Sequence, residues 1–246
     1  MIDIDALSWQ IKSQLNDFSN NAPRSLQRSI GPSEVGGDCD RKLAYKIMGK
    51  ESVNEPDKWL AQIGTWVHAG LAEMYIKIND PANPRYLVEE RVTVTDTLAG
   101  SADLVDLHNK LVIDWKVVGP TSLKQYRKDG PSDQYRVQSH LYAYGLINKH
   151  GIDITDVAIV FLPRGGFLKE MYVWSEPYNE DIALGGLARL SAVREIIEIA
   201  GEDSISSFPA MTQHCHFCPF FLPGSTDFKI GCPGGDIQPN NNKERR

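Results

Sequence analysis

The sequence lacks any long apolar run. A helix that crosses a bilayer needs about 20 consecutive, mainly apolar residues, and the mean hydropathy of this 246-residue chain is -0.32. The first ten residues, MIDIDALSWQ, are acidic, and no short apolar segment with a small-residue cleavage site follows them. We therefore expect a soluble, cytoplasmic protein with no membrane partner.

Cysteine is scarce, and positive charge is not in excess. The chain has four cysteines, a net charge of -6 and a pI near 5.5. In a reducing compartment, thiols are metal ligands or buried side chains more often than disulfides. The acidic balance argues against a protein that coats nucleic acid. It does not argue against an enzyme, because clustered carboxylates lower the net charge and a bound divalent cation reverses the local sign.

Internal repeats are absent, and so is the GxxxxGK[ST] motif of P-loop ATPases. Any ATP-driven unwinding of a substrate would therefore require a separate helicase. The polar end QPNNNKERR is predicted to be disordered. The length fits one large domain with an appended cap. We expect an N-terminal helical segment at 1–57, a catalytic core at 58–200, a cysteine-rich segment at 201–235 and a tail at 236–246.

The spacing of apolar residues predicts most of the secondary structure. Steps of three and four residues indicate helices, whereas alternation and short β-branched runs indicate strands. Helices are expected at 5–18, after Cys39, and at 58–78, 133–149 and 179–199; strands are expected at 86–95, 101–107, 111–118, 157–162 and 167–174. Three consecutive strands imply antiparallel pairing, and a helix before the fourth strand allows a parallel pair. The predicted fold class is α/β (α+β) with a mixed central sheet.

Two consecutive strands carry the carboxylates of a candidate metal site. GSADLVDL places Asp103 in one strand, and LVIDWKVV places Asp114 and Lys116 two residues apart on one face of the next. A hairpin would bring the two carboxylates close together, where they repel each other and favour a cation such as Mg²⁺ or Mn²⁺. Lys116 can then orient or deprotonate water and neutralise charge on a phosphate. The alternative is a strand end with solvated charges.

Three further side chains fit such a site. His68 lies on the long helix in GTWVHAGLAE, and imidazole is a good ligand for Mn²⁺, although a lone helix histidine is more often satisfied by the core or by solvent. Gln138 and Tyr142 are one helical turn apart and share a face. They can hold a phosphate or nucleotide and Lys116, or they form an ordinary polar surface.

The strings GTWVHAGLAE, GSAD, VIDWK and QSHLY resemble, in order and spacing, the motifs of the RecB-like nucleases of the PD-(D/E)XK superfamily. The resemblance spans 31–232 and implies the restriction-endonuclease-like αβββαβ core, with N- and C-terminal segments forming a cap. It implies a divalent metal bound by His68, Asp103, Asp114 and the backbone carbonyl of Trp115. It also implies that Lys116 is the catalytic lysine and that Gln138 and Tyr142 form an accessory motif.

The cysteines also suggest a metal site. Cys39 precedes the predicted core, and a C-x2-C-x13-C pattern follows it, formed by Cys215, Cys218 and Cys232. Four thiolates suit either a zinc ion or an iron-sulfur cluster. The chain looks similar to CRISPR-associated RecB-like and AddB-type exonucleases, which implies a structural 4Fe-4S cluster, with Zn²⁺ as the alternative. The last gap is longer than is usual there, so His214 and His216 are alternative fourth ligands.

Basic and aromatic side chains are candidates for substrate contacts. The basic ones follow Cys39 or surround a predicted TSLKQYRKDG loop: Arg41, Lys42, Lys46, Lys124, Arg127, Lys128 and Arg136. Each contacts phosphate or belongs to a solvated face. The aromatic candidates either stack on unpaired bases or pack in the core. They are Trp66, Tyr126 and Tyr135.

Together these features predict a metal-dependent DNA exonuclease that acts on single-stranded or frayed ends. The expected contexts are recombination, repair, phage DNA metabolism and CRISPR adaptation, with a helicase, a recombination protein or a CRISPR protein as partner. A structure-specific endonuclease with the same site and a noncatalytic DNA-binding or assembly module are the alternatives. The sequence leaves the oligomeric state open.

Overall fold

A computed structural model describes residues 3–22, 29–211 and 214–235, so the predicted tail lies outside the described residues. The chain forms two compact units. The first, which we name the sheet unit, comprises Met1–Gly36 and Lys58–Ala188, and the second, the cysteine unit, comprises Gly37–Asp57 and Arg189–Arg246. None of the helices in the described ranges combines the length and hydropathy that a bilayer crossing requires. The four-segment division stays a prediction.

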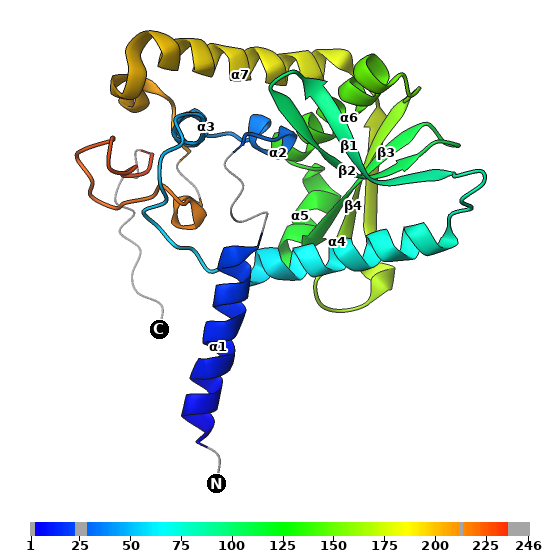
Figure 1. Ribbon diagram of the computed structural model, residues 1–246, viewed down its shortest axis with the longest axis horizontal. Coiled ribbons are helices and arrows are strands. Elements are labelled where there is room, and N and C mark those ends of the chain that lie inside the picture. The colour runs from blue at the N-terminus through cyan, green and yellow to red at the C-terminus, as the bar shows by residue number, and fades with distance from the viewer. Residues whose placement is uncertain (1–2, 23–28, 212–213, 236–246) are drawn as a thin grey trace. The chain divides into compact units, whose positions relative to one another are not determined.

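The sheet unit contains a five-stranded mixed sheet in the order β1-β2-β3-β4-β5 (Figure 1). The strands are β1 (Tyr86–Thr95), β2 (Leu98–Asp106), β3 (Leu111–Val118), β4 (Asp156–Pro163) and β5 (Tyr172–Pro177). β3 and β4 pair in parallel, whereas the other neighbours are antiparallel. The predicted α/β fold class with a mixed central sheet is confirmed. β4 is buried along most of its length, as expected of a strand covered on both faces.

Two helices cover opposite faces of this sheet. α4 (Trp59–Ile78) places Leu71 and Tyr75 against a cluster that includes Trp115 of β3. α6 (Asp133–His150) places Tyr135 against a cluster that includes Val118 of the same strand. Because side chains three residues apart on a strand point to opposite faces, the two helices lie on different sides. α6 can approach β1 closely because Gly145 has no side chain; a Cβ there would lie 2.5 Å from Val92.

Two predicted elements are wrong in part. TSLKQYRKDG, expected to be a loop, belongs to helix α5 (Pro120–Asp129), which has proline in its first turn and is followed by Gly130 with φ 78°. The strand expected at 167–174 begins only at Tyr172, because residues Leu168–Glu170 form the 3₁₀ turn η1, in which the Glu170 N–H donates to the Phe167 carbonyl at 2.9 Å.

The sheet unit also contains α1 (Ile4–Asn21), α2 (Pro32–Val35) and the first part of α7 (Glu180–Ala200). The Asp3 carboxylate caps α1 by accepting the backbone N–H groups of Asp5 and Ala6 at 3.0 and 3.1 Å. α1 meets α4 where the rings of Phe18 and Trp66 lie 6.4 Å apart.

The cysteine unit contains α3 (Asp40–Ile47), the end of α7, and the 3₁₀ helices η2 (Gly201–Ser207) and η3 (Cys215–Phe217). Its core contains Tyr45, Ile205, Phe220 and Cys232. The Tyr45 hydroxyl donates to the Phe228 carbonyl at 2.6 Å. α3, the helix expected after Cys39, is thereby joined to the C-terminal part of the same unit.

Candidate active site

The candidate site lies where the ladder between β2 and β3 ends. The predicted hairpin is present, and its last regular pair is Leu104 with Ile113. One residue further along, Asp103 and Asp114 lie on neighbouring strands. The Trp115 N–H donates to Asp103 Oδ2 at 2.8 Å. A carboxylate thus satisfies a backbone donor that the interrupted ladder leaves without a strand partner.

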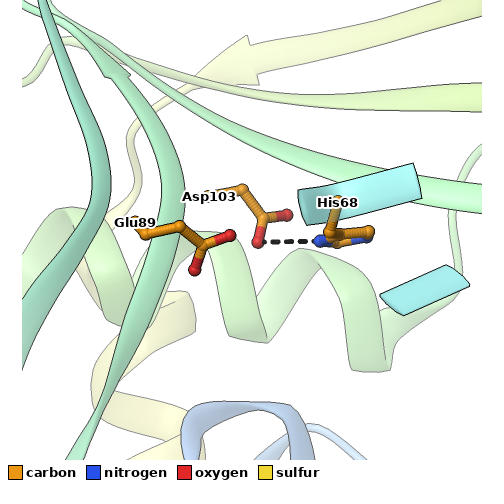
Figure 2. Close-up of side chains that lie close together, drawn as sticks. All are labelled: His68, Glu89 and Asp103. Atoms are coloured by element: carbon orange, nitrogen blue, oxygen red, sulfur yellow. Dashed lines mark hydrogen bonds and ion pairs between the residues drawn. The ribbon is translucent and has the colours of Figure 1, made fainter. Parts of the chain in front are cut away.

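Asp103 also lies at an interruption on its other side, between β2 and β1. The ladder pairs Val88 with Leu104 and Glu90 with Ala102, and it omits the pair between them, Glu89 with Asp103. Glu89 has a φ of 50°, in the left-handed region that residues with a side chain seldom adopt. Figure 2 shows the Glu89 and Asp103 side chains extending from adjacent strands toward the same space.

His68 of α4 completes a three-residue group with these two carboxylates. One ligand atom from each of His68, Glu89 and Asp103 lies within 4.8 Å of the others (Figure 2). His68 Nδ1 is 3.1 Å from Asp103 Oδ1. Burial lowers the His68 pKa, but the hydrogen bond and charge of Asp103 outweigh it, so this pKa lies above its ordinary value. The same negative field favours a cation.

Asp114 and Lys116 form an ion pair beside this group. Lys116 Nζ is 2.6 Å from Asp114 Oδ2, and the side chains are only 16% and 3% exposed. Gln138 of α6 joins them: its Nε2 donates to Asp114 Oδ1 at 2.9 Å, and its Oε1 accepts from Lys116 Nζ at 3.2 Å. Burial raises the Asp114 pKa to about 6, although the Lys116 charge opposes that rise.

Two tyrosines of α6 lie in different surroundings. Lys116 Nζ lies 4.7 Å from the centre of the Tyr135 ring, within the range of a cation–π contact. The Tyr142 hydroxyl is beside Gly100 of β2, where an added Cβ would lie 2.9 Å from it. The structure therefore places Gln138 against Lys116, and Tyr142 against β2. The roles predicted for both residues stay predictions.

The aromatic residues considered for base stacking differ in exposure. Tyr126 and Tyr135 pack around Phe161, and the Tyr126 and Phe161 rings stack with centres 4.4 Å apart. Both therefore contribute to the core, which is the second of the two roles considered for them. Trp66 is 44% exposed and meets Trp59 edge to face at 5.8 Å.

Glu89 was missed by sequence reasoning, although its strand was correctly placed. Counting back from the 95–98 hairpin, where Thr95 pairs with Leu98, would put Glu90 opposite Asp103. The register changes by one between Thr93 and Thr95, so Glu89 takes that position. A one-residue slip moves side chains to the other face. The adjacent glutamates in YLVEERVTV are the only signal in the sequence for this residue.

The site can hold a hard divalent cation. Glu89 and Asp103 supply oxygen ligands and His68 supplies nitrogen, a donor set that suits Mn²⁺ or a related ion. Among the described residues, this is the one group of at least three His, Cys, Asp or Glu side chains with such close ligand atoms. Asp114 stands beside it, with its oxygens directed to Lys116 and Gln138.

The four cysteines all belong to the cysteine unit, and each is a free thiol. Cys39 Sγ accepts the Lys42 N–H at 3.4 Å at the start of α3. Burial raises the Cys218 pKa, and among the smaller contributions the charges of Cys39 and Cys232 raise it further. The cysteines do not form a group with sulfur atoms within 4.8 Å of one another in the described part of the chain.

No family model matches the sequence, and no curated protein matches it. The fold is similar to that of an alkaline exonuclease (LHK-Exo) from Laribacter hongkongensis, with 11% identity and a TM-score of 0.50 over 73% of this chain and 93% of that one. The crystal structure of LHK-Exo in complex with dAMP gives 13% identity and a TM-score of 0.51 with the same coverage. A phage-related exonuclease from Haemophilus somnus 129PT gives 14% identity and a TM-score of 0.43 over 63% of this chain and 78% of that one.

Proposed function

We propose that this chain is a divalent-metal-dependent deoxyribonuclease that removes nucleotides from DNA ends, with single-stranded or frayed ends as its substrate. The observation that carries the proposal is the close group of His68, Glu89 and Asp103 beside the Asp114–Lys116 ion pair. The fold shared with an alkaline exonuclease that was crystallised with dAMP supports the same chemistry.

Each side chain has a part in this proposal. Glu89, Asp103, His68 and Asp114 would hold Mg²⁺ or Mn²⁺, which supplies polarisation of the phosphoryl oxygen and a more acidic bound water. Lys116, together with Gln138, would orient the attacking water and neutralise charge that develops on the phosphate. The resemblance to RecB-like nucleases implies that the Trp115 backbone carbonyl is a further metal ligand.

The decisive experiment measures DNA cleavage with Mg²⁺, with Mn²⁺ and with EDTA. Asp103→Asn, Asp114→Asn and Lys116→Met are each expected to reduce cleavage at least about a hundredfold, the lower range for one general acid–base group. Asp153→Asn is the matched control, because Asp153 is an exposed carboxylate in an ordinary ion pair with Lys110. Cleavage that persists in Asp114→Asn, or occurs in EDTA, would count against the proposal.

Linear and circular single-stranded DNA distinguish an exonuclease from a structure-specific endonuclease. An exonuclease degrades linear DNA labelled at either end and leaves the circle intact, whereas a structure-specific endonuclease also opens circular substrates that carry a junction or a flap. A noncatalytic DNA-binding module binds both substrates and cleaves neither. The proposed activity suits recombination, repair, phage DNA metabolism or CRISPR adaptation, where a helicase partner would supply the frayed end.

We propose that the cysteine unit carries a structural 4Fe-4S cluster held by Cys39, Cys215, Cys218 and Cys232, with Zn²⁺ as the alternative. Two observations support a shared site. The charges of Cys39 and Cys232 contribute to the raised pKa of Cys218. The Gly234 N–H donates to Cys232 Sγ at 3.4 Å. Backbone hydrogen bonds of this kind tune cluster sulfurs. An iron-sulfur cluster is larger than a single metal ion, so the cysteine sulfurs that bind it lie farther apart than those that bind one ion.

Purification without oxygen tests this second proposal. Bound iron and sulfide with a brown colour are expected, and Cys218→Ser should lose both together with thermal stability. Stoichiometric zinc without iron would establish the alternative. A wild-type protein with neither metal, or a metal-free Cys218→Ser protein of unchanged stability, would overturn the site.

A further inference from the structure

A basic hollow lies along helix α5 in the sheet unit. It has a volume of about 350 Å³. Lys124, Arg127 and Lys128 provide its charged wall, Pro120 and Leu123 its apolar part, and Gly165 and Glu170 the opposite side. Residues three and four apart share one side of a helix, so the three cations form a continuous row.

The charges of this hollow favour an anion. Three cations face one carboxylate, that of Glu170, which also accepts the Phe167 N–H at 3.4 Å. Arg127 donates to the backbone carbonyl of Glu170, so its guanidinium is held at the wall while its charge stays uncompensated by that contact. Lys128 is 83% exposed and only 3.7 Å from Asp129, which is a loose surface pair. Within the described residues, Lys124 has neither an ion pair nor a side-chain hydrogen bond.

The hollow lies close to the candidate active site along the chain and through packed rings. β3, which carries Lys116, ends at Val118, and α5 begins two residues later. The Lys116 ammonium lies 4.7 Å from the Tyr135 ring centre, and the Tyr135 and Tyr126 ring centres are 5.9 Å apart. Tyr126 directly precedes Arg127 on α5. The cations of α5 therefore follow the carboxyl end of the strand that carries Asp114 and Lys116.

We propose that this hollow binds consecutive backbone phosphates of the DNA strand whose cleaved bond lies at Lys116. This inference rests on the proposed nuclease function and adds the path of the substrate. Lys124 and Lys128 are one turn apart, about 6 Å along the helix axis. Cations spread in this way suit a series of phosphates better than one small anion. Contacts of this kind hold a strand in place without reading its sequence.

Equilibrium binding tests the proposal directly. A fluorescent dT20 strand is titrated in EDTA at several salt concentrations, with fluorescence anisotropy as the readout. Lys124→Gln/Arg127→Gln/Lys128→Gln is expected to weaken binding at least tenfold and to reduce the slope of log K against log salt by about 2, since each phosphate contact on a single strand contributes about 0.7.

A matched triple variant controls for net charge. Lys77, Lys110 and Lys149 are surface lysines of the same unit, 70%, 50% and 46% exposed, each paired with a carboxylate. Replacing all three by glutamine removes the same charge and should change affinity less than threefold. Equal losses in the two triple variants would mean a general field effect, which overturns the proposed hollow. A poly-glutamate chain that binds wild type as tightly as dT20 would overturn it too.

A short substrate separates strand positioning from catalysis. Thymidine 5′-(p-nitrophenyl phosphate) has one phosphodiester and no neighbouring backbone phosphates, so the α5 triple variant should hydrolyse it at the wild-type rate. A loss on this substrate would assign α5 to the reaction itself. If no metal supports cleavage of any DNA while binding still depends on α5, the proposed function fails and the hollow stands. If DNA is cleaved and the α5 triple variant binds dT20 as tightly as wild type, the proposed role of the hollow is overturned and the proposed nuclease function stands.

Discussion

Glu89 lies across the β1–β2 ladder from Asp103, at a position where the two strands do not pair. Its φ of 50° places the backbone in the left-handed region. That conformation costs a residue with a side chain about 1–2 kcal/mol relative to the usual one. The strain coincides with a carboxylate that reaches His68 and Asp103. Strained backbone often occurs at functional sites, where surrounding structure maintains it.

Two substitutions at Glu89 separate strain from ligation. Glu89→Ala and Glu89→Gly both remove the carboxylate, so both should weaken Mn²⁺ binding at least about tenfold, a loss seen even for outer-shell partners of metals. Glycine adopts positive φ without penalty, so Glu89→Gly should be more stable than Glu89→Ala by about 1 kcal/mol. Mn²⁺ titration calorimetry and chemical denaturation without metal measure the two effects.

Arg91, two residues further along the same strand, is the control. Its φ is not positive, so glycine there should be less stable than alanine by about 0.5–1 kcal/mol. The order of the two variants is thus expected to reverse between the two sites. The same order at both sites would show that Glu89 is not strained in solution.

Asp106 provides a structural counterpart to Asp103 on β2. Arg85 binds it with two hydrogen bonds, Nε to Oδ1 at 3.1 Å and Nη2 to Oδ2 at 2.7 Å. Asn109 adds a third donor from its side chain at 2.9 Å. Asp106→Asn should therefore lower the free energy of unfolding by about 2 kcal/mol, the range for hydrogen bonds to charged groups. Glu73→Gln, in the exposed Glu73–Lys77 pair, should change it by less than about 0.5 kcal/mol.

The effect of Asp106→Asn should depend on pH. Burial raises the Asp106 pKa, but the hydrogen bonds from Arg85 and from the Asn109 backbone outweigh it, so this pKa lies below its ordinary value of 3.8. The unfolded chain then binds the proton first, and stability from the ionised carboxylate is present above pH 3.8 and is lost as pH falls through the folded pKa. Denaturation curves of the two proteins should converge in acid. A constant difference down to pH 2 would contradict this assignment.

Gln138 is expected to act on the rate of DNA cleavage. It holds both Asp114 and Lys116 through its amide. Gln138→Ala should lower kcat for DNA cleavage at least about tenfold, because Lys116 loses the acceptor that orients it. Gln134→Ala is the control one turn earlier, since Gln134 donates to the Ser33 carbonyl at 2.8 Å. Equal effects on kcat would mean that α6 was merely loosened.

Local patterns in the sequence were enough to predict the strands that carry Asp103 and Asp114. β3 is a continuous apolar run interrupted by DWK, and a short turn fixes its pairing with β2. The position of Glu89 was beyond such reasoning, because a one-residue change of register near Thr93 decides which glutamate faces Asp103.

The helix α5 and the packing of the two tyrosines could not be predicted for a different physical reason. The segment after Gly119 was predicted to be a loop, although proline in the first turn and glycine after the last residue are favourable helix ends. Tyr126 and Tyr135 pack on Phe161, which is distant in sequence. Contacts of that range cannot be read from spacing. Asp106 is likewise distinguished from Asp103 as a structural residue by its ion pair with Arg85, which directly precedes β1 and is distant in sequence.

His140 should make the stability of the sheet unit sensitive to mild acid. It is fully buried on α6, with Nε2 at 2.8 Å from Glu176 Oε1, while Nδ1 accepts the Asn179 N–H at 3.2 Å. Arg136 also binds Glu176, at 2.9 and 2.8 Å, and the Tyr178 ring lies 6.0 Å from the imidazole. An acceptor role for Nδ1 fixes the neutral tautomer with the proton on Nε2.

Burial lowers the His140 pKa below 6.5, although Glu176 opposes this. The unfolded chain therefore takes up a proton at a higher pH than the folded protein does, so stability falls as pH decreases from 6.5 toward the folded pKa, by at most about 1.4 kcal/mol per pH unit. His140→Gln should remove this slope, whereas His108→Gln, in an exposed turn, should retain it. Denaturation at pH 7.5 and pH 5.5 without metal measures the difference. His68 is present in all three proteins, so its opposite contribution cancels. An equal loss of stability in wild type and His140→Gln would show that folding leaves the His140 pKa unchanged.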